Sequence, residues 1–315
     1  MSPCSVIVPT LNAAERLPRL LERLWAQQPP PAEILIIDSA SRDDTVAQAA
    51  RFHCRIHGIE RAAFDHGGTR HLGLSLTSSR YAVFLTQDAL PCDTGFLAAL
   101  LAPLEAGCAA AYARQMPYPG ASPLEQFQRA FNYPPCSYVR RAADLERLGL
   151  KAAFFSNVAS AVDREAYGAV GGFPSGVVFN EDMMLACRLL RAGYQIAYAA
   201  EARVFHSHSY ALSQQFRRYF DIGASHFQGD ASLRGLASSQ EGSRFAWCQM
   251  RALLRQRAWR WLPRGFAELA VKWLAFQLGH NAHRLPRAMC ARLSLQQGFW
   301  LRPQAARAAA AGRHL

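Results

Sequence analysis

The sequence is poor in acidic residues, in long apolar runs and in paired cysteines, and each shortage narrows the class of protein. Only 23 Asp and Glu residues oppose 35 Lys and Arg residues, which gives a formal net charge of +12. Such a balance favours an anionic partner: substrate phosphates, an acidic lipid surface or nucleic acid. No window reaches the roughly 18 uninterrupted apolar residues that a spanning helix needs. We therefore expect a chain that is soluble or lies on a membrane surface.

The eight cysteines are scattered along the chain without a C-x-x-C spacing. A disulfide-rich secreted domain is therefore excluded, and reduced thiols in the cytosol are the simplest interpretation. The first five residues run directly into a strand pattern, so we expect no signal peptide. What the 315 residues do offer is apolar content, because 50% of them are hydrophobic, enough to bury a full α/β core.

Short apolar strands alternate with amphipathic helices in the first part of the chain. Residues 5–8 are predicted as a strand that ends at Thr10, and residues 33–37 as a second strand that ends at Asp38. This alternation predicts βαβ units in a mainly parallel sheet, with both polar strand ends on one edge. The carboxylate of Asp38 can accept the N–H of a pyrimidine base or a ribose hydroxyl there, and a turn that caps its own backbone is the alternative.

The strongest strand pattern, residues 81–85, leads into Thr86, Gln87 and Asp88. It predicts a buried strand that delivers Asp88 to its carboxyl end, where open α/β sheets bind their ligands. A single carboxylate at such a position suits a hard cation that bridges two phosphate oxygens. An acidic turn without a metal is the alternative interpretation.

Two other segments carry candidate chemistry. Gly67 and Gly68 stand before a predicted helix, where free backbone N–H groups attract phosphate, and Arg70 one turn later would contact the same anion. Glu181 and Asp182 lie in the first turn of another predicted helix, a position that the helix dipole favours for acidic side chains. A plain helix start is the alternative for each pair.

Three further predictions concern local structure. The side chain of Asn180 is expected to cap the helix that follows it. The proline-rich residues 114–123 are expected to form a mobile loop over the site, with the aromatic side chains after them as stacking surfaces or as anchors. His206 and His208 stand two apart in an extended segment, so we expect them on opposite faces, with at most one near a metal shared with Asp88.

Four segments resemble, in their order and their amino-acid sequence, the inverting family 2 glycosyltransferases of the GT-A fold. These segments are Val6-Ile-Val-Pro-Thr-Leu-Asn12, Ile36-Ile-Asp38-Ser-Ala-Ser-Arg-Asp-Asp-Thr45, His66-Gly-Gly-Thr-Arg70 and Phe84-Leu-Thr-Gln-Asp88-Ala. The last two look most like the rhamnosyltransferase branch, whose donor is a dTDP-linked L-rhamnose. The family's metal motif has Asp at both ends of a D-x-D triplet. This sequence has Thr in the first place, a loss that rhamnosyltransferase-like members share.

The resemblance covers about residues 4–230 and implies a GT-A α/β domain over residues 1–230. That domain would have a mainly parallel central sheet flanked by helices, followed by a helical appendage over residues 231–315. Within residues 244–300, Trp and Leu are interleaved with Arg, and no run is long enough to span a membrane. Such basic amphipathic helices fit contact with a membrane surface, which a lipid-carried acceptor would require. A dimerisation module and a cap on the sheet are the competing interpretations.

The resemblance also implies roles for individual residues. Asp88 and His208 would bind Mg²⁺ or Mn²⁺, and Asp182 would be the catalytic base, with Glu181 beside it. Asn157 and Arg218 would contact the acceptor or the diphosphate, Arg218 because Gln215-Phe-Arg-Arg218-Tyr219 resembles a Q-x-x-R-W motif of processive relatives. The residues expected at the nucleotide and its diphosphate are Pro9, Thr10, Asn12, Asp38, Gly67, Gly68, Arg70, Gln87 and Asp88.

The expected function is inverting transfer of a sugar, L-rhamnose from dTDP-L-rhamnose, to a cell-surface glycan or a lipid-linked saccharide. The expected location is the cytoplasm, at the inner face of the cytoplasmic membrane. One alternative keeps the fold and uses a UDP-hexose or UDP-HexNAc donor. Alternatives of another class are a basic nucleic-acid-binding protein and a catalytically silent scaffold. Nucleic acid is disfavoured because carboxylates fall at the strand ends that face the proposed site.

Overall fold

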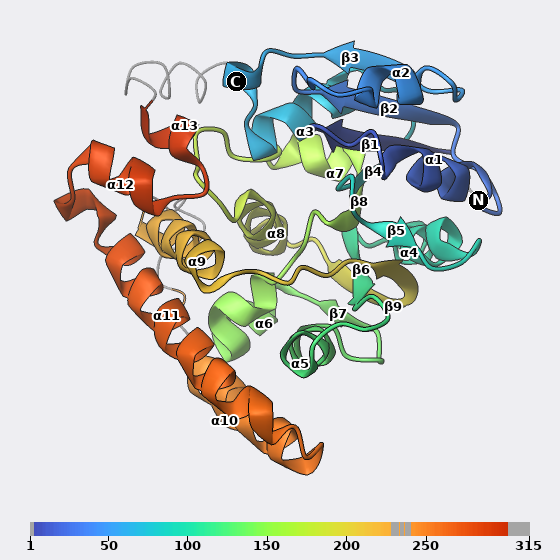
Figure 1. Cartoon of the computed structure of the whole chain (residues 1–315). Coiled ribbons are helices and arrows are strands. Elements are labelled where there is room, and N and C mark those ends of the chain that lie inside the picture. Colours follow the sequence, from blue (N-terminus) through green and yellow to red (C-terminus); the bar gives the residue numbers. More distant parts are fainter. Residues whose placement is uncertain (1–2, 228–232, 234–235, 237–240, 302–315) are drawn as a thin grey trace.

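The structure is a computed structural model that describes residues 3–227, 233, 236 and 241–301. Its strands are β1 (Cys4–Thr10), β2 (Glu33–Asp38), β3 (Arg55–Gly58), β4 (Tyr81–Leu85), β5 (Leu90–Pro91), β6 (Ala110–Met116), β7 (Tyr138–Arg140), β8 (Ala159–Asp163) and β9 (Ile196–Phe205). In the described residues these nine strands form one sheet in the order β3-β2-β1-β4-β8-β6-β9-β5, with β7 paired to β9 (Figure 1).

Helices cover both faces of this sheet (Figure 1). They are α1 (Leu17–Trp25), α2 (Thr45–Ala49), α3 (His66–Ser75), α4 (Phe96–Glu105), α5 (Pro123–Asn132), α6 (Ala142–Leu148), α7 (Arg164–Ala169), α8 (Glu181–Arg191), α9 (Leu212–Phe227), α10 (Glu241–Arg255), α11 (Leu262–His280), α12 (Arg287–Leu293) and α13 (Gln297–Leu301). Residues 241–280, which form two long helices, project from the molecule as a C-terminal arm. None of the described helices is long and apolar enough to cross a membrane.

The sheet is parallel in its first half and mixed in its second. Strands β3, β2, β1 and β4 run parallel, as the βαβ pattern predicted. Strand β8 runs antiparallel to both β4 and β6, whereas β6 and β9 are parallel. The α/β fold is confirmed, with the mainly parallel part confined to the first four strands. Strand direction in the second half depends on where the chain returns to the sheet, which a local pattern does not specify.

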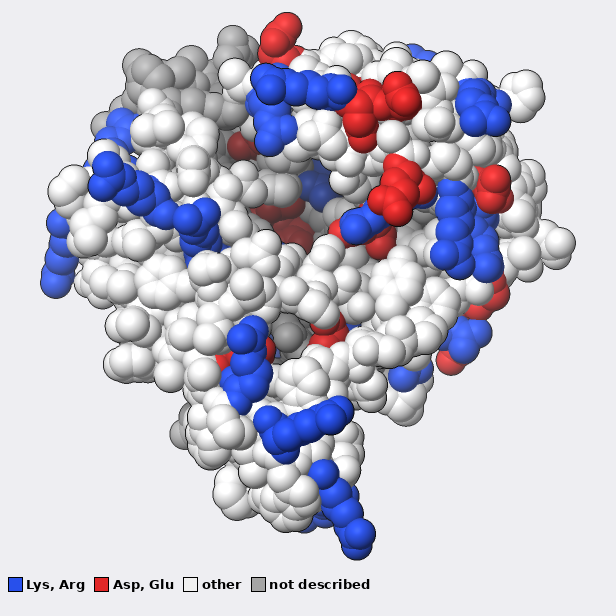
Figure 2. Space-filling model, viewed as in Figure 1, with Lys and Arg blue, Asp and Glu red and all other residues white. Residues whose placement is uncertain are grey.

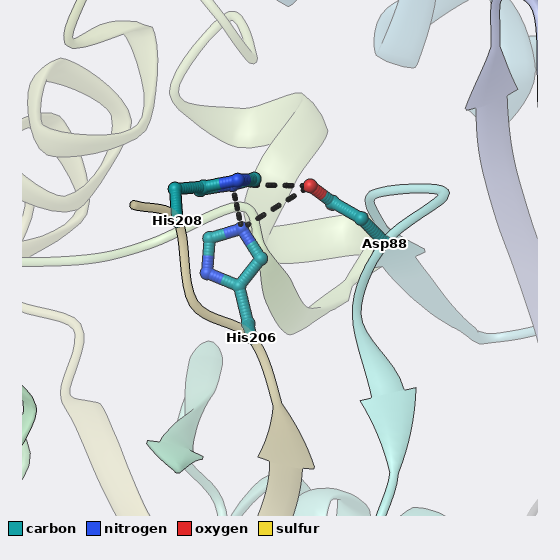
Figure 3. A group of neighbouring side chains, drawn as sticks. All are labelled: Asp88, His206 and His208. Atoms are coloured by element: carbon teal, nitrogen blue, oxygen red, sulfur yellow. Dashed lines mark hydrogen bonds and ion pairs between the residues drawn. The ribbon is translucent and has the colours of Figure 1, made fainter. Parts of the chain in front are cut away.

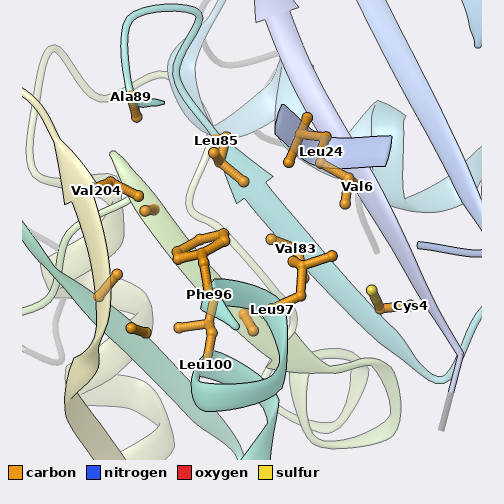
Figure 4. Close-up of a cluster of buried hydrophobic side chains, with 14 of the residues drawn as sticks. Cys4, Val6, Leu24, Val83, Leu85, Ala89, Phe96, Leu97, Leu100 and Val204 are labelled. Carbon is orange, nitrogen blue, oxygen red and sulfur yellow. The ribbon is translucent and has the colours of Figure 1, made fainter. Parts of the chain in front are cut away.

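Both faces of the sheet are buried, which explains why its central strands are almost wholly apolar. Val83 and Leu85 point to one face, where they pack with Phe96 of α4 and Leu24 of α1 (Figure 4). Phe84, between them in sequence, points to the other face and packs in the cluster that includes residues of α8. Burial of each such large apolar side chain contributes roughly 1.5–3 kcal/mol to the free energy of folding. The two layers fix the carboxyl ends of β1, β2 and β4 at one edge.

The predicted loop at residues 114–123 is confirmed for residues 117–122, which lie in no helix or strand, and was wrong at its two ends. Its mobility stays a prediction. Strand β6 continues to Met116, and α5 begins at Pro123, where proline fits because its missing N–H is not needed in the first turn. Ser122 caps this helix by accepting a hydrogen bond from the backbone N–H of Glu125 at 3.3 Å. The aromatic side chains that follow are anchors, because the rings of Phe127 and Phe131 pack against a phenylalanine of α10.

The C-terminal helices pack closely against α9. Phe220 and Ala224 of α9 share a buried cluster with Ala275 of α11 and Trp300 of α13. The backbones of α9 and α11 approach so closely that a Cβ added at Gly279 would lie 2.0 Å from the carbonyl oxygen of Phe220. The predicted division of the chain at residue 230 lies outside the described residues and stays a prediction.

Gly279→Ala should lower the free energy of unfolding by about 3 kcal/mol, the upper range for overpacking, because the opposing atom is backbone and cannot turn away. The matched control is Gly168→Ala, since a Cβ at this exposed helical glycine meets open space. That change should raise stability by about 0.5–1 kcal/mol. Urea denaturation of both variants checks the pair. Equal stability of the two variants would contradict the close contact between α9 and α11.

Candidate functional site

A cavity of about 1000 Å³ opens where β1, β2 and β4 end, and we call it the strand-end cavity. Figure 2 shows a hollow in the middle of this face, with acidic and basic side chains in its wall. The wall residues from the strand ends and from α3 are Pro9, Thr10, Ser39, Gln87, Asp65, His66 and Arg70. Residues 295–299 and Leu301, around α13, complete it from the far end of the chain.

The residues predicted at the nucleotide divide into wall residues and supports. Gln87 lines the cavity and holds the β1 loop, since its Oε1 accepts the N–H of Leu11 at 2.7 Å. Asp38 is buried at 4% exposure, and its carboxylate accepts from the Thr10 hydroxyl at 3.1 Å. Asn12 accepts the backbone N–H of Arg42 at 2.9 Å. Asp38 and Asn12 are not part of the cavity wall. They stabilise the loops that shape it.

The two glycines lie inside the first turn of α3, and the prediction that they precede the helix was wrong. Asp65 is the cap, and its Oδ1 already accepts the N–H of Gly68 at 2.7 Å. Gly67 is required for packing, because a Cβ there would lie 2.6 Å from the carbonyl oxygen of Pro174. The side chain of Arg70 does reach the wall of the cavity.

A buried ion pair joins α3 to α8. Nη1 of Arg70 lies 3.3 Å from Oε1 of Glu181, and the two side chains are 5% and 8% exposed. Asn157 donates from its Nδ2 to the same carboxylate oxygen at 3.3 Å. Nε of Arg70 and the hydroxyl of Ser39 have no hydrogen-bond partner within the described residues. Both are buried polar groups of residues that line the cavity.

Asp182 follows Glu181 in the first turn of α8. Its carboxylate accepts the backbone N–H of Asn157 at 3.1 Å and that of Met183 at 2.8 Å. Burial and the neighbouring charge of Glu181 raise the pKa of Asp182 to about 7, although the two N–H groups lower it. A carboxylate with a pKa near neutrality suits proton removal from a hydroxyl. The prediction that Asn180 caps this helix through its side chain was wrong, because that amide donates to Ser225 instead.

Asp88 and two histidines converge at the end of β9 (Figure 3). Oδ2 of Asp88 lies 3.1 Å from Nε2 of His208 and 3.6 Å from Nε2 of His206. The two Nε2 atoms are 3.0 Å apart. The prediction that only one histidine could approach Asp88 was wrong. Strand alternation does not apply to this pair, because β9 ends at Phe205 and both histidines lie beyond it.

The surroundings of this cluster suit a divalent transition metal. Burial lowers the pKa of His206 to about 4 in spite of Asp88, so its ring is neutral, and Nδ1 lies 2.9 Å from Oε1 of Gln115. A proton on Nδ1 leaves the Nε2 lone pair free for a ligand bond. Burial would raise the pKa of Asp88, but the two neighbouring histidine rings outweigh burial and hold this pKa far below its usual range. One carboxylate oxygen and two imidazole nitrogens therefore face a common point.

Sequence reasoning missed several residues of the site. Gln296 donates from its Nε2 to Nε2 of His66 at 2.9 Å, and both residues line the strand-end cavity. The backbone before Gln296 is fixed by Asp221, which accepts the N–H of Leu295 at 2.9 Å. No local signal marks a contact between positions 66 and 296. Ser39 was missed although it adjoins Asp38, whereas His206 was considered and set aside in favour of His208.

A second cavity, of about 450 Å³, lies between α5, α9 and α11, and we call it the α11 cavity. Arg218 is in its wall, with the guanidinium group 4.9 Å from the ring centre of Phe179. His208 is in the same wall, so this cavity adjoins the Asp88 cluster.

Known proteins resemble this chain at the level of sequence. The protein-family model described as glycosyl transferase family 2 matches residues 5–171. The O-antigen chain rhamnosyltransferase RfbN of Salmonella typhimurium is 36% identical over 303 residues, which are 94% of this chain and 95% of that protein. The O-antigen chain rhamnosyltransferase WbaN of Salmonella anatum is 36% identical over 304 residues, with 95% and 96% of the two chains covered.

Solved structures resemble it at the level of fold. A mannosyltransferase from Pyrobaculum calidifontis, in complex with GDP-Man and Mn²⁺, has a TM-score of 0.57 at 18% identity, with 98% of this chain and 80% of that chain covered. TarS of S. aureus, in complex with UDP-GlcNAc, has a TM-score of 0.54 at 14% identity, with 90% and 91% covered. These structures share the fold of this chain. The family match and the two relatives show that the chain belongs to glycosyltransferase family 2.

Proposed function

We propose that the protein is an inverting glycosyltransferase that moves L-rhamnose from dTDP-L-rhamnose to a saccharide acceptor of a cell-surface polysaccharide. The observation that carries this proposal is the 36% identity to O-antigen chain rhamnosyltransferases over nearly the whole chain. The strand-end cavity supports it with room for a nucleotide sugar and with unpartnered polar groups on Ser39 and Arg70. The donor would lie with its diphosphate toward Arg70.

Asp182 is the base in this proposal. It removes the proton from an acceptor hydroxyl as that oxygen attacks the anomeric carbon from the side opposite the diphosphate. The bond from the anomeric carbon to the diphosphate oxygen breaks with inversion, and the proton stays on Asp182. Glu181 acts through Arg70, because it fixes the guanidinium group at 3.3 Å. Glu181 is thus a positioning residue in this proposal, and Asn157 holds both carboxylates in place.

Asp88, His206 and His208 would hold a divalent cation, and we propose Mn²⁺ in preference to Mg²⁺. When bound, the cation neutralises charge on the departing diphosphate. The donor set supports this choice, because imidazole nitrogens suit transition metals whereas Mg²⁺ prefers oxygen ligands. The mannosyltransferase with the similar fold was solved with Mn²⁺. The ring of His206 is neutral, which metal binding requires.

The C-terminal arm supports a location at the inner face of the cytoplasmic membrane. Trp247, Trp259, Phe266 and Trp273 are all more than half exposed. Basic side chains accompany them on the projection formed by α10 and α11 (Figure 2). Aromatic side chains with basic neighbours favour an interface of anionic lipid. The proposed occupant of this surface is therefore a lipid bilayer, which would bring a lipid-linked acceptor to the site.

The donor assignment predicts a selective rise in the thermal midpoint. With Mn²⁺ present, dTDP should raise it above the values for UDP and GDP, because a ligand that binds only the native state stabilises it by mass action. Mn²⁺ should support a larger rise than Mg²⁺, and His206→Ala should remove the metal-dependent part. Differential scanning fluorimetry measures all of these. A rise with UDP alone would discard the donor, and an unchanged metal response in His206→Ala would reject the three-ligand site.

The base assignment predicts a loss of chemistry without a loss of donor binding. Asp182→Asn should lower dTDP release from dTDP-L-rhamnose, with water as acceptor, by about 10²- to 10⁴-fold. In the native protein this rate should fall about tenfold per pH unit as the pH drops below about 7, since protonation of a base with a raised pKa removes it. Glu181→Gln should instead cost about 3 kcal/mol of stability, because it leaves a buried cation without its partner. A flat pH profile would refute the role of Asp182.

The membrane assignment predicts binding to anionic vesicles. The protein should co-sediment with phosphatidylglycerol vesicles and not with phosphatidylcholine vesicles, and the double change of Trp247 and Trp273 to Ser should abolish this. Val46→Ser is the control, because Val46 is a 44% exposed apolar residue on α2, far from the arm in sequence. Vesicle binding by the double variant at the native level would contradict the assignment.

A further inference from the structure

We propose that Gln296 is a positioning residue for the donor: it keeps the proton of the His66 ring on Nδ1, so that this N–H donates to a diphosphate oxygen of the nucleotide sugar. This inference rests on the proposed function and deepens it by adding a residue from the C-terminal end of the chain. Gln296 lies far beyond the family match, which ends at residue 171. Neither His66 nor Gln296 is among the residues that the sequence predicted at the nucleotide.

The contact between these two side chains decides which ring nitrogen carries the proton. Nε2 of Gln296 lies 2.9 Å from Nε2 of His66. The amide nitrogen of a glutamine only donates hydrogen bonds, so Nε2 of His66 accepts and carries no proton. The single proton of a neutral imidazole is then on Nδ1. A charged ring is disfavoured here, because it would set an N–H of its own against the amide.

The surroundings of His66 also favour the neutral ring. Burial lowers the pKa of His66. The charges of Glu181 and Asp65 oppose this effect, whereas those of Arg70 and Arg218 support it, and the net change is downward. Because an unperturbed histidine has a pKa of about 6.5, a lowered pKa leaves the ring neutral near neutral pH.

The other ring nitrogen is open to a ligand. Nδ1 of His66 has no hydrogen-bond partner within the described residues and, unlike Nε of Arg70, it is not closed off from water. His66 lines the strand-end cavity as the first residue of α3. Arg70, one turn later, lines it too and donates from its Nη1 to the carbonyl of His66 at 2.8 Å. The two residues therefore belong to the part of the wall toward which the diphosphate is proposed to lie.

The backbone on both sides of Gln296 is anchored, as the role of a positioning residue requires. In addition to the contact with Asp221 before it, the hydroxyl of Ser294 accepts the N–H of Gln296 itself at 2.8 Å. On the other side, Arg287 donates from Nε and Nη2 to the carbonyl of Trp300 at 3.1 and 2.9 Å. Trp300 is only 5% exposed. The amide of Gln296 is therefore presented from a fixed segment.

The first test locates the proton by NMR. A long-range proton–nitrogen correlation spectrum of the full chain with isotope-labelled histidine, without nucleotide or metal, distinguishes the two neutral forms of each ring. His66→Asn identifies the signals of His66, which should show the proton on Nδ1 in the native protein. Gln296→Met keeps the length of the side chain but removes the donor, so the proton should redistribute toward Nε2. In Gln296→Glu the carboxylate accepts, so Nε2 should carry a proton.

The second test shows whether Gln296 acts on the donor through His66. His66→Ala should weaken dTDP binding about tenfold, the effect of one hydrogen bond. Gln296→Met should weaken it a few-fold, because only part of the population then carries the proton on Nδ1. In the His66→Ala protein the same change should have no further effect, since the two residues act as one unit. Isothermal titration calorimetry with Mn²⁺ measures dTDP binding in the native protein, both single variants and the double variant.

Gln277→Met is the matched control. Gln277 is exposed on α11 and lies in the wall of neither the strand-end cavity nor the α11 cavity. This change should leave both dTDP binding and the His66 signals as they are in the native protein. The thermal midpoint of each variant without ligand shows whether it is folded.

Two outcomes would overturn the inference. One is a proton on Nε2 of His66 in the native protein. The other is an equal effect of Gln296→Met with and without the His66 ring, which a purely structural role of the C-terminal segment would give. Failure of the proposed function looks different. If UDP or GDP binds in place of dTDP, the donor assignment falls, and non-additivity of the two changes with that nucleotide would still support the inference, because all three carry a diphosphate.

Discussion

The buried ion pair between Arg70 and Glu181 is the contact on which the arrangement of the site depends. It connects the second turn of α3, at the strand-end cavity, to the first turn of α8, where Asp182 lies. The two residues are separated by 111 positions in sequence. Both charges are withdrawn from water, so the pair holds only because other groups complete it, namely the carbonyl of His66 and the amide of Asn157. In the proposed mechanism, this one contact couples the position of the donor to that of the catalytic base.

Much of the first half of the fold follows from local patterns. An apolar run that stops at a polar residue indicates a strand end at the sheet edge, and Thr10, Asp38 and Asp88 follow this rule. The helix that begins at Glu181 could be predicted for a similar reason, because acidic side chains favour a first turn. The order of these segments was enough to identify the family. Strand ends, helix starts and short motifs could be predicted because each is determined by residues close together in the sequence.

What could not be predicted depends on contacts between distant segments. The direction of β8 and the contact of Gln296 with His66 depend on where the chain comes back to the sheet and to α3. The spacing of residues in the sequence does not specify either position. The error at His206 has another cause. Alternation is a property of strands, and the sequence does not mark that the strand stops at Phe205. The roles of Gly67 and Gly68 were likewise misjudged because the cap at Asp65 was not recognised.

The wall that residues 295–299 and Leu301 give to the strand-end cavity has a consequence for biosynthesis. A ribosome makes the chain from its amino end, so β1, β2 and β4 are complete while this segment has not yet been joined. A nascent chain that has emerged through residue 227 holds every strand of the described sheet but lacks one side of the strand-end cavity. The full pocket therefore forms only after the last described helix has left the exit tunnel.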